Sequence, residues 1–287
     1  MACVRINGVE LADAVKADVK GSVLRLQRDG IEACLATILV GDDQASATYV
    51  KKKHEACAEV GINATDHRLG ARAGQDELNA LIERLNSDAR VHGILLQLPL
   101  PGHLDASEAI SRISPEKDVD GLGTANMGRL AAGQAGHVPC TPLAVMYMLD
   151  HFKIELAGKT VVIINRSSLV GKPLYQLLLG RDATVITCHS RTKDIARFSG
   201  MADVVITAVG DRGRFELTPD MISDGCVVID VAITRHNGKL AGDADYEKVA
   251  SKASHATPVP GGVGPMTVAM LLKNTTAAAA GANGIEL

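Results

Sequence analysis

Short apolar runs alternate along the chain with segments of helical periodicity, and this alternation constrains the fold more than any other feature of the sequence. The runs are of strand length, and most are bounded by Gly, Asp or Ser. Such an order is typical of α/β proteins with largely parallel sheets. It predicts strands at Ala33–Val40, Val91–Leu98, Thr160–Ile164, Ala183–Cys188, Ala202–Ala208 and Cys226–Val231.

The segments between these runs carry the periods and terminal signals of helices. Gly30 and Gly61 follow two of them, at positions where helices commonly end. Thr141 and Pro142 are predicted as the N-cap and the first residue of another helix. The predicted helices are Leu11–Arg28, Ser46–Val60, Asp76–Leu85, 142–149, Gly171–Leu179 and the Ala-rich segment 267–281.

The 287 residues are enough for two domains of roughly 100–200 residues each. We predict an α/β catalytic domain at residues 1–138 and a doubly wound, Rossmann-like domain at 139–266. The helical tail, 267–287, is predicted to pack back on the first domain.

Composition excludes several classes of protein. The net charge of −3, the absence of Trp and an aromatic content of 2% disfavour nucleic acid as a partner. No apolar run approaches the roughly 18 residues of a membrane helix, and Arg5, Glu10 and Asp13 interrupt any signal peptide. Six scattered cysteines without a C-x-x-C pair, and histidines without a metal-binding pattern, indicate a cytoplasmic protein with reduced thiols and no metal site.

A candidate dinucleotide site follows the strand that ends at Ile164. The polar turn 165–173 (N-R-S-S-L-V-G-K-P) leads into a helix, whose free N–H groups and dipole favour an anion. The usual G-x-G-x-x-G is missing, so an ordinary strand-to-helix turn remains an alternative.

The end of the next strand favours NADP over NAD. That strand ends in H-S-R-T at His189–Thr192, without the carboxylate that binds the ribose hydroxyls of NAD. Arg166, with Ser190 and Arg191, would suit a 2′-phosphate, because a guanidinium pairs with phosphate in a bidentate fork. The alternative is that these side chains are merely solvated surface residues.

Candidate catalytic residues lie in the first part of the chain. Ser46, Tyr49 and Lys53 share one face of a predicted helix, although a lone lysine on a helix is usually a solvated charge. Gln97 ends a predicted strand, where the sites of α/β proteins gather. Asp120 follows in a loop with Asp118, and could equally be a turn residue.

A further segment, 257–267 (T-P-V-P-G-G-V-G-P-M-T), is too rich in Pro and Gly to lie inside a strand or helix. We predict a rigid loop whose glycines let the backbone approach a ligand closely.

Together these segments resemble the bifunctional 5,10-methylenetetrahydrofolate dehydrogenase/5,10-methenyltetrahydrofolate cyclohydrolase family over essentially the whole chain. The run P-V-P-G-G-V-G-P-M-T is long and highly specific. The matching segments are the helix with Tyr49 and Lys53, Q-L-P-L-P at Gln97–Pro101, P-E-K-D-V-D-G at Pro115–Gly121, P-C-T-P at Pro139–Pro142, R-S-x-x-V-G-x-P at Arg166–Pro173, and Pro258–Thr267.

The resemblance implies a role for each matched residue. Lys53 falls on the catalytic lysine, Gln97 on its glutamine partner, Tyr49 on the tyrosine that stacks on the folate and Asp120 on the carboxylate that holds the pterin. Arg166, Ser167 and Ser190 fall on positions that contact NADP. The candidate sites are catalytic Lys53, Tyr49, Gln97 and Asp120; substrate-binding Tyr49, Ser46, Gln97, Leu98, Pro99, Asp120, Pro260, Gly261 and Gly262; and cofactor-binding Asn165, Arg166, Ser167, Ser190, Arg191 and Ile233.

The activity that the resemblance implies belongs to one-carbon metabolism. NADP would oxidise 5,10-methylenetetrahydrofolate to the 5,10-methenyl form, and water would convert that product to 10-formyltetrahydrofolate. The family also implies a folate-binding cleft between the two domains, a homodimer and no need for a metal.

Two departures from the family pattern leave an alternative open. Asn165 stands where the family normally has Gly, and Ala232 lies in D-V-A-I-T where the family commonly reads D-x-G-I-N. Both flank the expected cofactor site, so a cyclohydrolase with weak or lost dehydrogenase activity is the alternative. A ligand-binding regulator or a plain nucleotide-binding scaffold would not explain Tyr49, Lys53, Gln97 and Asp120 together.

Overall fold

The computed structural model describes residues 2–287, which fold into two compact units. The first unit comprises Asp13–Cys140 and Val268–Leu287, and the second comprises residues 2–12 and Thr141–Thr267. The predicted domain boundaries assign residues 1–12 to the first domain, whereas in the structure residues 2–12 group with the second unit. The reason is β1 (Val4–Arg5), which pairs in parallel with β11 (His255–Ala256) in the sheet of the second unit.

The first unit is built on a three-stranded parallel sheet in the order β3 (Asn63–Leu69), β2 (Cys34–Val40), β4 (Gly93–Leu96). The central strand β2 is buried along its whole length. The edge strand β3 was not predicted, because its residues (N-A-T-D-H-R-L) are polar and largely exposed and carry no apolar period. Strand β4 is shorter than the predicted Val91–Leu98, since Pro99 follows and Gln97 already lies outside the strand.

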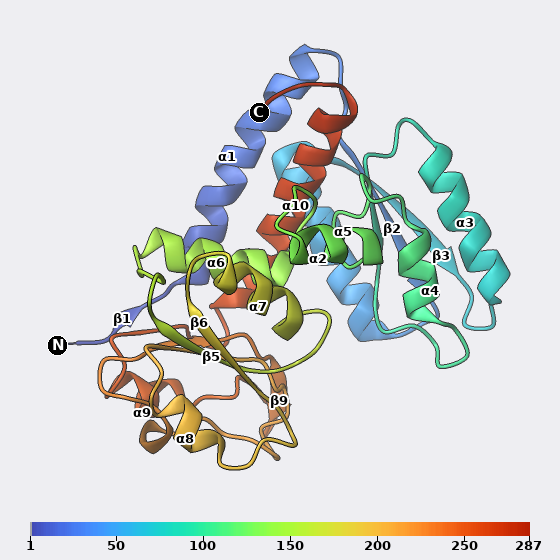
Figure 1. The fold of residues 1–287 in the computed structure, drawn as a ribbon. Coiled ribbons are helices and arrows are strands. Elements are labelled where there is room, and N and C mark those ends of the chain that lie inside the picture. Colours follow the sequence, from blue (N-terminus) through green and yellow to red (C-terminus); the bar gives the residue numbers. More distant parts are fainter. Residues whose placement is uncertain (1) are drawn as a thin grey trace. The chain divides into compact units, whose positions relative to one another are not determined.

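Helices cover the sheet of the first unit. Leu78, Ile82 and Leu85 of α3 pack against Ile38 and Ile94 of the sheet, and α4 completes the same core cluster. Figure 1 shows α3 and α4 beside this sheet. The helices of the unit are α1 (Gly8–Arg28, from Asp13 onward), α2 (Gln44–Val60), α3 (Gln75–Ser87), α4 (Ala106–Arg112), α5 (Thr124–Ala131) and α10 (Val263–Ala282, from Val268 onward).

The second unit is built on a six-stranded parallel sheet in the order β1-β11-β8-β7-β5-β6, in which β8 is Val227–Asp230. Strands β6 (Thr184–Cys188) and β7 (Val204–Thr207) lie on opposite sides of β5 (Thr160–Ile164), so the strand order reverses at β5. Doubly wound sheets bind ligands at the carboxyl ends of strands at such a reversal.

The second unit also contains helices and several short strands. Strands β1 and β11 have two residues each and were not predicted, since two residues carry no period. The helix α6 begins at Cys140, so the prediction of Thr141 as an N-cap is wrong. The other elements are α6 (Cys140–His151, from Thr141 onward), α7 (Gly171–Leu179), α8 (Ile195–Ser199), the 3₁₀ turn Pro219–Met221, β8 (Val227–Asp230), the antiparallel pair β9 (Thr234–His236) and β10 (Lys239–Ala241), and α9 (Tyr246–Ala250).

Within residues 2–287, none of the helices combines the length and the apolar character needed to cross a membrane.

Candidate active site

The helix α2 carries the residue at the centre of the site, Lys53. The helix starts cleanly because the Asp43 side chain accepts a hydrogen bond from the Ser46 backbone N–H at 2.7 Å, and it ends at Gly61 in a left-handed conformation. Tyr49 is 50% exposed, whereas Ser46 is buried. Of the residues predicted to share one face of α2 with Lys53, Ser46 is therefore buried, and Tyr49 has a ring that a ligand can reach.

The Lys53 amine meets the side chain of Gln97, which follows β4. Lys53 Nζ donates to Gln97 Oε1 at 3.0 Å, and Gln97 Nε2 donates to the Leu98 carbonyl at 2.7 Å. Gln97 is thus held from both ends of its amide, with its oxygen facing the amine. The predicted pairing of these two residues, which lie 44 positions apart in the sequence, is present in the structure.

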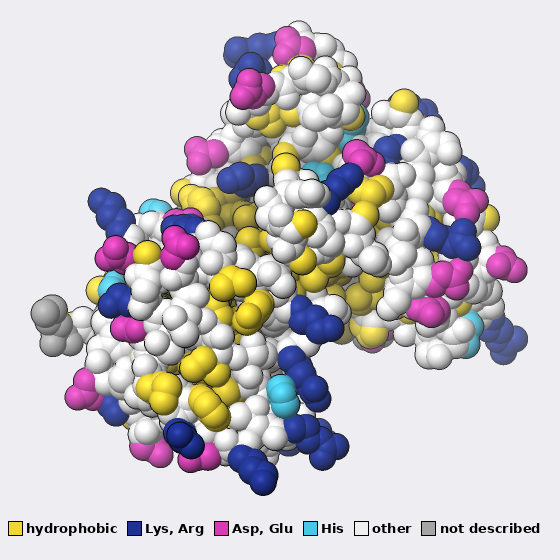
Figure 2. Space-filling model, viewed as in Figure 1, with side chains coloured by type: hydrophobic (Ala, Val, Ile, Leu, Met, Phe, Trp, Pro, Cys, Tyr) yellow, Lys and Arg dark blue, Asp and Glu magenta, His cyan; other side chains and the backbone are white. Residues whose placement is uncertain are grey.

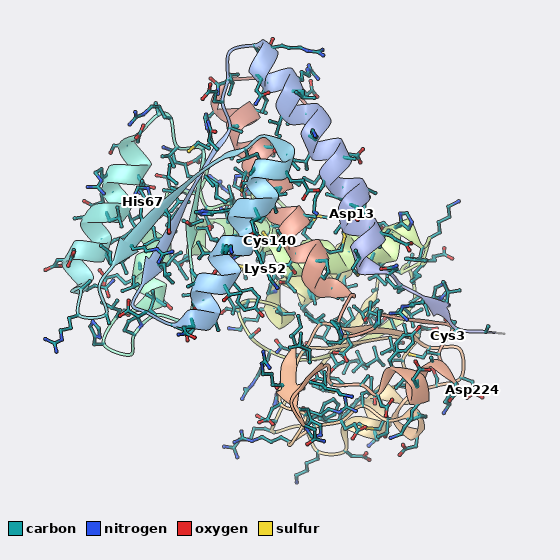
Figure 3. All side chains as sticks on the ribbon, turned by 180° about the vertical axis from the view of Figure 1, so that it is seen from behind. Cys3, Asp13, Lys52, His67, Cys140 and Asp224 are labelled. Carbon is teal, nitrogen blue, oxygen red and sulfur yellow. The ribbon has the colours of Figure 1, made fainter. Side chains whose placement is uncertain are left out.

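Burial lowers the pKa of the Lys53 amine below its ordinary value, and the Asp120 carboxylate is the strongest charge opposing that shift. The neighbouring cations Lys51 and Lys52 are not among the causes of this shift. Desolvation is instead the principal cause, and Lys51 pairs with Glu55 at 3.8 Å on the exposed side of α2. Figure 3 labels Lys52 on the same helix.

The two carboxylates of the 118–120 loop have different surroundings. Asp118 is the turn residue: its side chain accepts hydrogen bonds from the Gly123 N–H at 2.8 Å and from Asn126 Nδ2 at 2.9 Å. Burial raises the pKa of Asp120, and the Lys53 amine opposes this shift. Gly121, with φ of +67°, lies so close to Pro139 that any side chain there would clash.

Two residues beside Asp120 were not singled out from the sequence. The Cys140 thiol is buried, and its desolvation, followed by its proximity to Asp120, raises its pKa well above the ordinary value. Asn274 of α10 donates to the Val119 carbonyl at 2.8 Å and to the Val138 carbonyl at 3.0 Å. Figure 3 shows Cys140 among the side chains seen from behind. Only the three-dimensional structure brings Asn274 to Val119, which is 155 positions away.

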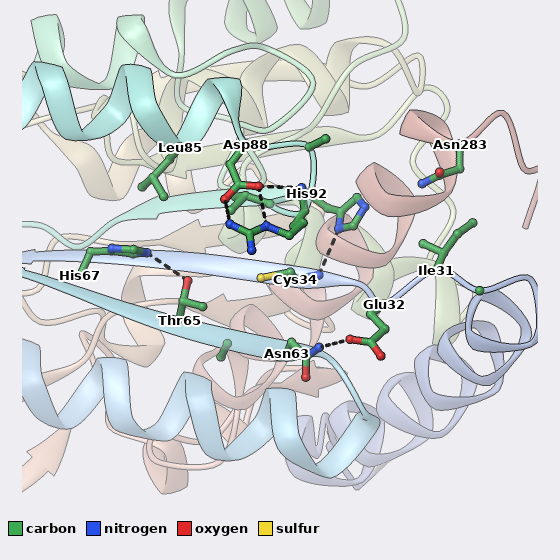
Figure 4. A pocket seen from close by; sticks show the side chains of 15 residues that line it. Ile31, Glu32, Cys34, Asn63, Thr65, His67, Leu85, Asp88, His92 and Asn283 are labelled. Atoms are coloured by element: carbon green, nitrogen blue, oxygen red, sulfur yellow. Dashed lines mark hydrogen bonds and ion pairs between the residues drawn. The ribbon is translucent and has the colours of Figure 1, made fainter.

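A cavity of about 830 Å³ lies at the opposite, amino-terminal edge of the same sheet (Figure 4). There the Cys34 backbone N–H donates to His92 Nδ1 at 3.2 Å, and Asn63 donates to Glu32 at 3.0 Å. None of the predicted catalytic residues lines this cavity. The carboxyl ends of the strands, where Gln97 lies, carry the candidate site instead.

In the second unit the turn after β5 is held together by the side chain of Asn165. Its Oδ1 accepts hydrogen bonds from the Ser167 and Gly171 N–H groups at 2.7 and 3.0 Å, and its Nδ2 donates to the Ala208 carbonyl at 2.6 Å. A side chain at Gly171 would overlap the Asn165 backbone. The turn leads into α7, where the expectation of free N–H groups is not met: the Gly171 N–H donates to Asn165 Oδ1, and the Lys172 N–H donates to the Ser167 carbonyl at 3.0 Å.

A pocket of about 770 Å³ opens at this turn. Arg166, Ser167 and Ser190 line it, as does Asn165, so four of the six predicted cofactor residues meet there. Arg191 and Ile233 do not line it, and both are exposed. The pocket also includes residues after β7 that the sequence analysis missed, namely Val209, Asp211, Arg214 and Phe215.

The chemistry of this pocket fits a dinucleotide with a 2′-phosphate. It holds two guanidinium groups, Arg166 and Arg214, although Asp211 pairs with Arg214 at 3.2 Å. No carboxylate stands at the end of β6, where His189 and Ser190 lie. Figure 2 shows Lys and Arg side chains gathered around a histidine on one side of this unit.

The Pro- and Gly-rich loop packs its glycines against backbone of its own unit. The Gly8 N–H donates to the Gly261 carbonyl at 2.9 Å, and a side chain at Gly262 would overlap the Pro258 carbonyl. Pro260 is exposed. The glycines therefore allow this close internal packing, whatever ligand the exposed part of the loop meets.

Among the residues that the structure describes, no group of three or more His, Cys, Asp and Glu side chains is arranged to hold a metal ion.

Two family models match the chain. The model described as tetrahydrofolate dehydrogenase/cyclohydrolase, catalytic domain, matches residues 6–120, and the model of the NAD(P)-binding domain of the same family matches residues 139–283. The bifunctional protein FolD of Cenarchaeum symbiosum is 60% identical over 281 residues, which cover 98% of this chain and 100% of that protein.

Solved structures agree with these matches. The bifunctional enzyme FolD of Campylobacter jejuni has a TM-score of 0.95 and 46% identity, covering 98% of this chain and 99% of that one. The methylenetetrahydrofolate dehydrogenase-cyclohydrolase of Trypanosoma brucei, complexed with NADP cofactor and inhibitor, has a TM-score of 0.91 and 38% identity, covering 97% and 98%. These similarities confirm the predicted family and the predicted pair of α/β domains.

Proposed function

The chain belongs to the tetrahydrofolate dehydrogenase/cyclohydrolase family, and on this basis we propose that it oxidises 5,10-methylenetetrahydrofolate with NADP and hydrolyses the methenyl product to 10-formyltetrahydrofolate. Family membership confirms the predicted enzyme class, a dehydrogenase and cyclohydrolase that uses NADP. The roles of individual residues are our proposals.

The observation that carries the hydrolytic step is the contact of Lys53 Nζ with Gln97 Oε1 at 3.0 Å. Addition of water to the methenyl carbon requires a group that takes up a proton near pH 7. An amine does so only in its neutral form. Burial favours this form, because it lowers the pKa of Lys53. Gln97 orients the amine without adding a charge that would raise its pKa.

The folate contacts that we propose surround this amine. The half-exposed ring of Tyr49 offers a face on which the pterin stacks, and the Asp120 carboxylate accepts hydrogen bonds from the pterin amino group. The Gln97 amide is also proposed to contact the folate. The further proposed contacts are Ser46, Leu98 and Pro99 of the first unit and Pro260, Gly261 and Gly262 of the second.

The cofactor contacts that we propose lie in the second unit. Bound NADP supplies the hydride acceptor for the first step. Arg166 and Ser190 bind the 2′-phosphate, while Ser167 faces the pyrophosphate. Asn165, Arg191 and Ile233 complete the proposed set.

The two departures from the family pattern do not strain the cofactor site. Neither Asn165 nor Ala232 has a positive φ, so glycine is not required for the backbone at either position. Asn165 instead closes its turn with side-chain hydrogen bonds, and the Ala232 N–H donates to Asp230 at 3.0 Å. This geometry favours an enzyme with both activities over the cyclohydrolase-only alternative.

The proposal is tested by absorbance with purified protein and 5,10-methylenetetrahydrofolate. With NADP we expect NADPH to form and 10-formyltetrahydrofolate to accumulate. Hydrolysis of added methenyltetrahydrofolate without NADPH formation would establish the cyclohydrolase-only alternative. Loss of both reactions would overturn the proposed function.

We further propose that the protein is a homodimer that associates through β3. This strand pairs with β2 on one side only, so its seven residues leave a row of backbone groups at the sheet edge. Light scattering on the purified protein at micromolar concentration should give twice the mass of the chain. A monomer at every concentration would contradict this proposal.

A cytoplasmic location is proposed from the cysteines. All six are free thiols, as expected for a reducing compartment. Cell fractionation with an antibody to the protein tests this assignment.

A further inference from the structure

The second unit contains a buried carboxylate that the proposed mechanism does not use. Asp243 lies between β10 and α9 and is fully buried. Its Oδ2 accepts hydrogen bonds from Thr207 Oγ1 at 2.6 Å and from the Val209 N–H at 2.7 Å, and its Oδ1 accepts one from the Gly210 N–H at 2.9 Å. A buried carboxylate with three donors is a strongly directional anchor for the groups around it.

The groups that Asp243 holds belong to the loop that follows β7. This loop continues into residues that line the 770 Å³ pocket, namely Val209, Asp211, Arg214 and Phe215. Asp243 itself does not line the pocket. Its carboxylate therefore acts on the pocket indirectly, through its hydrogen bonds to the backbone of residues 209 and 210.

Two further side chains fasten the same loop and the loop after β8 to the segment that carries Asp243. Arg212 donates to the carbonyls of Gly242 and Ala244, both at 3.0 Å. Asp230, at the end of β8, accepts from the Ala244 N–H at 2.8 Å. A side chain at Gly242 would overlap the Asp230 carboxylate. The loop after β7 and the loop after β8 are therefore both hydrogen-bonded to segment 242–244.

We propose that Asp243 is a positioning residue for the dinucleotide, which sets the conformation of the loop after β7 and thereby the affinity for NADP. The inference rests on the proposed cofactor site. Because Asp243 does not itself line the pocket but holds the backbone of residues 209 and 210, it acts on dinucleotide binding and leaves the chemical step intact. A residue needed only for stability would lower the unfolding temperature without a selective change in dinucleotide affinity.

The test compares four variants of the full chain by fluorescence titration with NADPH and by steady-state kinetics. Asp243→Asn replaces one acceptor oxygen with a donor that faces other donors. Thr207→Val removes one of the three hydrogen bonds with little change in shape, and Thr207→Ser retains it. Asp203→Asn is the matched control, since Asp203 also accepts from backbone of this sheet, at 2.8 Å from the Thr160 N–H, but at the amino end of β5.

We expect Asp243→Asn to raise the Kd for NADPH and the KM for NADP about tenfold or more, because the loop after β7 loses the acceptor that fixes its backbone. The kcat at saturating NADP should stay within about threefold of wild type. Thr207→Val should shift the Kd in the same direction by less, and Thr207→Ser and Asp203→Asn should bind as wild type does.

The failures are distinguishable. Unchanged NADPH affinity in folded Asp243→Asn and Thr207→Val, with normal binding by the wild type, would overturn this inference alone. Should Asp243→Asn fail to fold, Thr207→Val decides. If the wild type binds no NADPH, the proposed function fails and the inference with it.

Discussion

At the residue scale, the chemistry depends on the surroundings of a single amine. Lysine is ordinarily protonated at neutral pH, with a pKa near 10.4. Burial of Lys53 favours the neutral form, while Asp120 opposes this shift, and the amine donates to the uncharged Gln97 amide at 3.0 Å. The proposed site therefore combines a proton acceptor, Lys53, with a nearby carboxylate, Asp120, for the folate.

The first prediction concerns the pH dependence of hydrolysis. The protonated amine is inactive, so kcat/KM of the cyclohydrolase should rise with pH through the Lys53 pKa. Gln97→Glu places a negative charge beside the amine, raises its pKa and should move the rising limb about one pH unit or more upward. Gln44→Glu adds the same charge at the exposed start of α2 and should leave the profile in place. Identical profiles for all three proteins would contradict this assignment.

The second prediction concerns Asp120. Asp120→Ala removes a charge-assisted hydrogen bond to the pterin and should raise the folate KM about tenfold or more. Asp42→Ala, a change at an exposed carboxylate, is the control. Steady-state cyclohydrolase assays give both values, and an unaltered KM in Asp120→Ala would remove this residue from the site.

The sequence could reveal those site residues that belong to a local pattern. Lys53, Tyr49 and Gln97 lie on a regular helix or at a strand end, so their placement followed from periodicity and the family motifs. Asn274 and Asp243 act through contacts with residues 155 and 36 positions away, and no local pattern encodes such pairs. The role of desolvation in lowering the Lys53 pKa likewise required the structure.

At the scale of elements, the turn between β5 and α7 shows how one side chain replaces a glycine. Asn165 supplies three hydrogen bonds that close the turn with φ in the ordinary negative range. The strands with apolar runs were predicted well, whereas the polar edge strand β3 and the two-residue strands were invisible to periodicity.

The third prediction tests the element that selects the cofactor. Arg166→Ala removes a guanidinium from the pocket and should raise the Kd for NADPH about tenfold, with little change for NADH, because only NADPH carries the 2′-phosphate. Arg181→Ala is a matched control, since Arg181 pairs with Asp150 at 2.7 Å after the far end of α7. An equal loss for both dinucleotides would place the 2′-phosphate contact elsewhere.

At the scale of the whole molecule, the division into two units separates the two halves of the chemistry. Lys53, Gln97, Asp120 and Cys140 all belong to the first unit, and the dinucleotide pocket belongs to the second. Each unit can therefore be perturbed through residues of its own sheet. The order of the chain does not reveal this division. Residues 2–12 come early in the sequence but belong to the second unit, and the residues from Val268 onward come last but belong to the first unit.

The fourth prediction concerns the stability of the folded chain. Burial raises the pKa of Asp230 to about 7, above the ordinary value near 3.9. The folded state then holds a proton that the unfolded state has lost, so the free energy of unfolding should fall as pH rises from about 4 to about 7. Asp230→Asn cannot titrate and should lack this part of the decline. Urea unfolding across this range measures both, and parallel curves would contradict the assignment.

The most direct test of the account is the cyclohydrolase rate of Lys53→Met beside that of Lys52→Met. The first variant loses the proposed proton acceptor, and the second loses only an exposed lysine one position earlier on α2. We predict a fall of about a hundredfold or more for Lys53→Met and wild-type turnover for Lys52→Met. Wild-type hydrolysis by folded Lys53→Met would contradict the central claim that this amine accepts the proton.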